Sequence, residues 1–316
     1  MEEQIHWAVN YEYLALKSAY ITLLISSISY LIYWVFNSKP MKTIGTIAFI
    51  VGAICLTATI GFRVIHSGRF PFIHSYEVFL TLGWMMLLVA LYADKLSKNV
   101  FAKTFTSFFV AVSMIYIEGF TDPSTDVVTP ALQSHWLEFH VATTMFGYAA
   151  FSVGFLAAEA YLVSKLDWLE ELSYKMSALG FPFLTVGIVS GAVWAQEAWG
   201  TWWGWDPKET ASLIMWLVYA AYLHMRLSRG WHGAKAAWMN LAGFLSMLFC
   251  FMGLNWIAQY FELNSEHVYS GGTQSVDRMA YFVYMVMAIA VVVFIGGMIM
   301  KMANARKSKT QDKSGK

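Results

Sequence analysis

Apolar runs of about twenty residues recur along almost the whole chain, and each could cross a hydrocarbon core of about 30 Å as a helix. Only 13% of the 316 residues are charged, whereas an average soluble domain has about 25%. A transmembrane barrel would instead show short segments of alternating apolar and polar residues. The sequence therefore predicts an all-α, polytopic transmembrane helical bundle.

Polar breaks divide these runs into about 8–9 spans, of which the fourth is polar enough to lie at the membrane interface instead. We expect one transmembrane domain over residues 1–303, followed by a basic, disordered cytoplasmic tail over 304–316. The expected spans are 13–36, 43–62, 77–93, 104–120, 139–164, 176–195, 209–227, 237–261 and 278–301.

The distribution of basic residues predicts how the bundle lies in the membrane. Sixteen of the 21 Lys and Arg residues fall in one set of alternate loops and in the C-terminal tail. Basic loops stay on the cytoplasmic side, so we expect the N-terminus outside and the C-terminus in the cytoplasm. The remaining five would lie on the outer side: Lys17, Arg63, Arg69, Lys208 and Arg278.

The stretch WGTWWGWDPKET, residues 199–210, gathers four tryptophans within seven residues. An aromatic belt at the membrane interface would account for one or two of them. Gly200 and Gly204 lie between the indoles, and glycine lets a backbone approach a ligand closely. We interpret the outer loop over 194–209 as a flat aromatic surface for a ligand, with these indoles: Trp199, Trp202, Trp203 and Trp205.

The charged half of this stretch predicts a helix start. Asp206 stands where an N-cap is expected, Pro207 at the first helical position and Glu209 at the third. Acidic side chains also suit the positive end of a helix dipole. Asp206 and Glu209 are therefore expected to begin the seventh span, whether or not they also contact a ligand.

Two histidines share the predicted outer side with the tryptophans. His140 lies at the outer end of the fifth span, and His267 lies in the last outer loop. Two neutral imidazoles facing each other across an aromatic surface would suit axial ligation of haem iron. His135 competes with His140 for this site, and the spacing does not choose between them.

His224 lies elsewhere. It follows Glu209 by 15 residues, which places it about 22 Å inward along a helix at ~1.5 Å per residue. An intramembrane ionisable residue is a functional candidate, but this chain offers no clear ligand partner at that depth. Either a second subunit supplies one, or His224 hydrogen-bonds a neighbouring helix.

The motif WGTWWGWDPKE resembles the WGxWWxWDxxE signature, or WWD domain, of the haem-handling proteins of cytochrome c maturation. The matching residues are Trp199, Gly200, Trp202, Trp203, Trp205, Asp206 and Glu209. The chain resembles the CcsA/ResC type of this family through further stretches between about residue 60 and residue 272. They are FPFIHSYEVFLTLGW, PALQSHWLEFHVATTMFGYAAF, MWLVYAAYLHMRLSRGWHG and EHVYSGG.

This resemblance implies two positions for haem b. His140 and His267 would be the axial ligands of an outer haem, and the tryptophan-rich residues with Asp206 and Glu209 would hold it. His224 would bind an intramembrane haem whose second ligand comes from a CcsB/ResB-type partner subunit. The fit departs from the family at His74, where relatives often have asparagine, and at His232, where many have arginine.

The resemblance also implies a function at a bacterial cytoplasmic (inner) membrane. The chain would move haem outward and present it for covalent attachment to the CxxCH motif of apocytochrome c, as the haem-presenting subunit of a cytochrome c synthase complex. Cys55 and Cys250 form no CxxC, so a separate pathway would reduce the apocytochrome thiols. No feature of the sequence suggests a nucleic-acid partner.

Two other functions fit parts of this pattern. A haem carrier that delivers to a chaperone, as the CcmC type does, would not need the additional spans or His224. A haem b electron-transfer subunit would normally pair its histidines within its own bundle, whereas His224 has no evident partner in this sequence.

Overall fold

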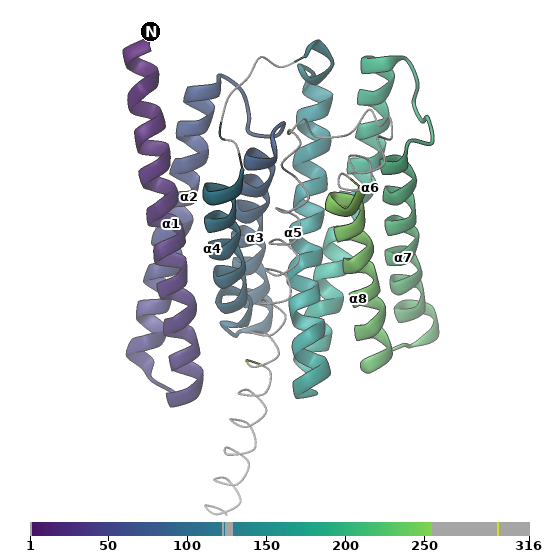
Figure 1. Cartoon of the computed structure of the whole chain (residues 1–316). Coiled ribbons are helices and arrows are strands. Elements are labelled where there is room, and N and C mark those ends of the chain that lie inside the picture. Colours follow the sequence, from purple (N-terminus) through teal and green to yellow (C-terminus); the bar gives the residue numbers. More distant parts are fainter. Residues whose placement is uncertain (1, 122, 124–128, 255–295, 297–316) are drawn as a thin grey trace, which may run out of the picture.

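The computed structural model describes residues 2–121, 123, 129–254 and 296. Within these residues the chain forms eight long helices and no strand (Figure 1), which confirms an all-α bundle. The long helices are α1 (Glu2–Phe36), α2 (Lys39–Ser67), α3 (Ser75–Ser97), α4 (Phe101–Phe120), α5 (His135–Ser164), α6 (Asp167–Trp199), α7 (Pro207–Arg229) and α8 (Ala234–Leu248). A 3-10 turn, Pro130–Leu132, precedes α5, and a π-helical turn, Phe249–Gly253, follows α8.

The first seven expected spans fall on α1 to α7, and the eighth, 237–261, falls on α8 and the turn after it as far as residue 254, where the described residues end. Seven of the described helices are long and apolar enough to cross a membrane, and α4, which the sequence left open as interfacial, is one of them. The helix α7 is not among the seven. The ninth expected span and the tail at 304–316 lie outside the described residues, so the total span count and the orientation stay predictions.

The helix axes are roughly aligned with one another, and successive helices run in opposite directions (Figure 1). In the described part of the chain, α1 packs against α2 and α4, α3 links α4 to α5, and α5 to α8 form a second group. The connections α2–α3 and α6–α7, the end of α4 and the start of α5 lie at one end of the bundle together with the start of α1 (Figure 1). We call this the tryptophan end, because the α6–α7 connection contains Trp202, Trp203 and Trp205.

Close packing of α5 on α6 depends on glycine. A Cβ atom built on Gly180 would lie 2.9 Å from the backbone oxygen of Gly147. Real Cβ atoms do not approach a backbone oxygen so closely, so a larger residue would force the helices apart. The short separation fixes the rotation of α5 relative to α6 and therefore decides which α5 side chains face α6.

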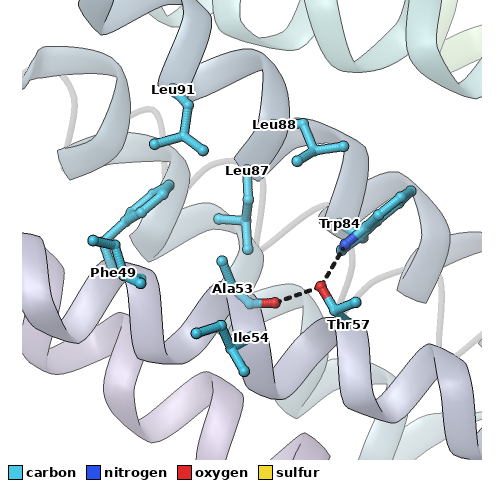
Figure 2. Close-up of a pocket in the computed structure, with 9 residues that line it drawn as sticks. Phe49, Ala53, Ile54, Thr57, Trp84, Leu87, Leu88 and Leu91 are labelled. Atoms are coloured by element: carbon cyan, nitrogen blue, oxygen red, sulfur yellow. Dashed lines mark hydrogen bonds between the residues drawn. The ribbon is translucent and has the colours of Figure 1, made fainter.

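An apolar pocket opens between α2 and α3 (Figure 2). Inside it, Trp84 Nε1 donates to Thr57 Oγ1 at 2.9 Å, and Thr57 Oγ1 donates to the backbone oxygen of Ala53 at 2.8 Å. None of its lining residues is titratable, so it offers no haem ligand. The lining consists of Phe49, Ile50, Ala53, Ile54, Thr57, Trp84, Leu87, Leu88 and Leu91.

Candidate functional site

The α6–α7 connection has a defined conformation set at both ends. Helix α6 ends at Trp199. Its C-cap, Gly200, adopts a left-handed φ of 81°, and the Gly200 N–H donates to the backbone oxygen of Gln196 at 3.1 Å. Helix α7 begins with Asp206 as N-cap and Pro207 as the first helical residue. The helix start predicted from the sequence is therefore confirmed.

Two carboxylates bind backbone N–H groups of this connection and of the first turn of α7. Asp206 accepts a hydrogen bond from the backbone N–H of Lys208 at 2.8 Å. The buried Glu209 side chain accepts from the backbone N–H groups of Gly204 at 2.8 Å and Asp206 at 3.1 Å. Asp206 and Glu209, both predicted site residues, therefore fix the conformation of the α6–α7 connection where it enters α7.

The indoles are arranged in edge-to-face pairs. The rings of Trp203 and Trp205 lie 5.8 Å apart at 87°, and those of Trp194 and Trp199 lie 4.9 Å apart at 72°. The expectation of one flat surface is therefore wrong for these pairs, because aromatic quadrupoles favour edge-to-face contact. Trp202 and Trp205 are 58% and 68% exposed, so two large apolar side chains are available to a ligand at the tryptophan end.

His140 is held in a defined orientation against α6. Its Nδ1 lies 2.6 Å from the backbone oxygen of Gly187, and its ring stacks on that of Trp194 at 6.1 Å and 20°. A carbonyl oxygen only accepts, so the contact requires a proton on Nδ1 and leaves the lone pair of the neutral ring on Nε2. Such an arrangement is typical of histidines that ligate metals through Nε2.

Glycine makes this orientation possible. A Cβ atom on Gly191 would lie 2.6 Å from His140 Nδ1, and one on Gly187 would lie 2.4 Å from Thr144 Oγ1. His140 can reach the Gly187 carbonyl only because these α6 positions lack side chains. Gly187 and Gly191 were not among the predicted site residues; the available signal in the sequence was their four-residue spacing, which places them on one face of a helix.

His135 and His140 are clearly distinguished by their surroundings. The His135 side chain is fully exposed at the first position of α5, where its Nδ1 lies 3.2 Å from Glu138 Oε2. His140 contacts the glycine face of α6 and Trp194. The second predicted outer ligand, His267, lies outside the described residues.

His224 lies on an exposed face of α7, with Ser228 Oγ at 3.5 Å from its Nδ1. Leu217 and Ile214, about two and three turns toward the tryptophan end on the same helix, are 53% and 52% exposed. His224 therefore faces outward from the described bundle. His232, in contrast, accepts a hydrogen bond from Arg226 at 2.5 Å.

The fold and this site together define a multi-pass helical membrane protein with an oriented imidazole stacked on the buried Trp194, and with exposed indoles in the α6–α7 connection. Residues 72–261 match the family model described as cytochrome c assembly protein. The chain therefore belongs to the cytochrome c assembly protein family.

Its similar proteins include the cytochrome c biogenesis protein CcsA of Guillardia theta, with 35% identity over 277 residues, covering 76% of this chain and 92% of that protein. The CcsA protein of Synechococcus elongatus is 34% identical over 281 residues, covering 69% and 86%. Among solved structures, the cytochrome c haem lyase CcmF superposes with a TM-score of 0.63 at 18% identity. That match covers 94% of this chain and 54% of CcmF, so the chain spans about half of CcmF and shares its fold.

Proposed function

We propose that this chain functions in cytochrome c biogenesis by moving haem b across a membrane and presenting it on the outer side to apocytochrome c. The observation that carries this proposal is the geometry of His140. Its Nδ1 is committed to the Gly187 carbonyl, its ring lies on Trp194, and Trp202 and Trp205 are exposed at the same end of the bundle. Family membership supports the same conclusion.

The donor set fits a haem at the tryptophan end. Haem needs axial nitrogen ligands and apolar surface against its ring, and His140 Nε2 and the exposed indoles would provide them. His267 would be the second axial ligand. The Glu209 and Asp206 carboxylates would contribute by fixing the loop that carries the indoles.

Attachment joins two vinyl groups of the haem to the two CxxCH thiols, and each new C–S bond is accompanied by transfer of the thiol proton to the neighbouring vinyl carbon. In our proposal the chain's residues position the reactants, and such positioning can lower a barrier by up to ~7–11 kcal/mol. The apocytochrome's own histidine would replace one of the two protein ligands. The thiols would arrive reduced by a separate pathway.

His224 would hold a second haem within the membrane. Its outward position on α7 supports a ligand contributed by another membrane subunit, for which a CcsB/ResB-type protein is the candidate. The two proteins together would form the cytochrome c synthase complex.

We further propose that residues 1–303 form one transmembrane domain in a bacterial cytoplasmic membrane. The tryptophan end would face outward and the basic segment 304–316 would be cytoplasmic. Attaching a reporter enzyme after residue 316, or within the connection 121–134, would test this orientation.

Absorption spectra of the chain purified with and without the partner test the function. Haem should co-purify, and His140→Ala and His267→Ala should each remove one fraction of it while His224→Ala removes another. His135→Ala is the matched control, because this exposed side chain has no contact with α6 in the described structure. The proposal would be refuted if the His140→Ala, His224→Ala and His267→Ala variants all retained the haem content of wild type.

A further inference from the structure

A buried cluster of charged residues lies at the tryptophan end, outside the site described above. Arg63 of α2, which is 1% exposed, donates through Nε and Nη2 to Glu77 Oε1 of α3 at 3.1 Å and 3.0 Å. Arg63 Nη1 also lies 3.7 Å from Glu12 Oε1 of α1, and that oxygen accepts from Tyr76 OH at 3.0 Å. The cluster therefore joins α1, α2 and α3.

The second Glu77 oxygen organises the α2–α3 connection. It accepts from Arg69 Nη1 at 2.7 Å and from the backbone N–H groups of Ile73 and His74 at 3.0 Å and 3.2 Å. In return, the His74 side chain accepts from the backbone N–H of Glu77 and completes a capping box. Accepting through Nδ1 places the ring proton of neutral His74 on Nε2.

Two N–H donors of this cluster are buried without an acceptor. Arg69 Nη2 and His74 Nε2 are both closed to solvent, and neither has a hydrogen-bond partner in the described structure. His66 Nδ1, in the same corner, is also without a hydrogen bond and lies 3.7 Å from Glu12 Oε2. Buried donors normally find partners, and an exception points to a bound ligand or water.

The chemistry of these donors selects an anion. Arg69 is always charged, and one arm of its planar fork is already held by Glu77, which orients the other. A carboxylate accepts readily from a guanidinium and an imidazole N–H together. Neither orphaned group has an acceptor lone pair, so a cation or a neutral donor would not satisfy them.

The cluster and the haem site are connected through one segment of chain. Arg63 Nη1 donates to the backbone oxygen of Pro123 at 2.6 Å. Trp194, on which His140 stacks, donates to the backbone oxygen of Ala131 at 2.9 Å. Both acceptors belong to the α4–α5 connection, which leads into the helix that carries His140.

We propose that Arg69 Nη2 and His74 Nε2 form a carboxylate subsite that binds a propionate of the haem presented at the tryptophan end. This inference rests on the proposed function, in which that haem is the cargo. The subsite would fix the rotation of the haem about the iron–histidine axis and thus the direction in which its vinyl groups point.

Titrating the purified, haem-stripped chain with its partner subunit against haem and haem dimethyl ester tests the subsite. The ester keeps the iron and the ring but removes both propionate charges. Arg69→Lys keeps the charge opposite Glu77 and removes the fork, while His74→Asn keeps a good helix cap and removes Nε2. Arg229→Lys, an exposed residue at the opposite end, is the matched control.

We expect wild type to bind haem about tenfold more tightly than the ester, and each variant to lose most of this preference through weaker haem binding alone. Equal binding of haem and ester by wild type would overturn the subsite and leave the haem function standing. Variants that weaken both compounds equally would show a purely structural role and also overturn it. Failure of wild type to bind either compound would overturn the proposed function itself.

Discussion

Replacing Gly191 with alanine should weaken haem binding through His140 alone. The new Cβ would lie 2.6 Å from His140 Nδ1, whereas ordinary contact begins at 3.4 Å, so the ring must move by the difference, about 0.8 Å. Moving away from α6 stretches the 2.6 Å contact with the Gly187 oxygen beyond good hydrogen-bond geometry. One such bond contributes about 1 kcal/mol, which corresponds to roughly a fivefold loss of affinity.

The assay is a haem titration followed by absorbance, with Gly61→Ala as the control. Gly61 also lies within a long helix, and a Cβ there would have nothing within 4 Å. The Gly61→Ala variant should bind haem with wild-type affinity. This control distinguishes a local clash with His140 from a general effect of replacing a helical glycine with alanine.

A double-mutant cycle completes this test. If Gly191 acts by orienting His140, then adding Gly191→Ala to His140→Ala should cause no further loss of affinity. Wild-type affinity in the Gly191 single variant would refute the reasoning. A roughly fivefold loss of haem affinity caused by Gly191→Ala in the His140→Ala background would also refute it, because the loss would then result from altered α5–α6 packing and not from His140.

Three further outcomes follow from the described contacts. Asp206→Ala should lower the free energy of unfolding of the purified protein by about 1 kcal/mol, because α7 loses its N-cap, whereas Asp206→Asn should be nearly neutral. The thermal unfolding midpoint in detergent measures this, and an Asp206→Ala midpoint equal to that of wild type would contradict it. Glu77→Ala should cost about 3–5 kcal/mol, because Arg63 then stays buried without its ion pair, and the amount of folded protein in the membrane should fall sharply. Arg63→Met with Glu77→Leu should recover only the part of that loss that comes from the buried Arg63 charge, because Glu12 and Arg69 then each lose an ion-pair partner; no recovery would argue against the Arg63 charge as a cause. His135→Ala should leave haem content within error of wild type, and a fall comparable to that of His140→Ala would move the ligand to His135.

Local signals predicted much of the fold. Runs of apolar residues placed the first seven expected spans on α1 to α7 and the described part of the eighth on α8, because a membrane helix must be about as long as the bilayer is thick. The start of α7 was also predictable, since Asp206, Pro207 and Glu209 act on backbone groups within a few residues of themselves.

Features that depend on pairs of distant residues were not predicted. His140 and Gly187 are 47 positions apart, and only the rotation of α5 against α6 brings them together. The same holds for Arg63 and Pro123, which are 60 positions apart. Both charged residues of the Arg63–Glu77 pair lie in apolar surroundings, which was a usable sign of pairing.

The Glu209 carboxylate has a consequence for the energetics of loading and release. Because it binds the N–H groups of Gly204 and Asp206, the loop is ordered by the chain's own contacts. The entropy needed to arrange the indoles is then lost when the protein folds, and under the proposed function little would remain to be lost when haem binds. Release would likewise return little disorder to the loop, so the competing ligand of the apocytochrome would have to supply most of the driving force for haem to leave.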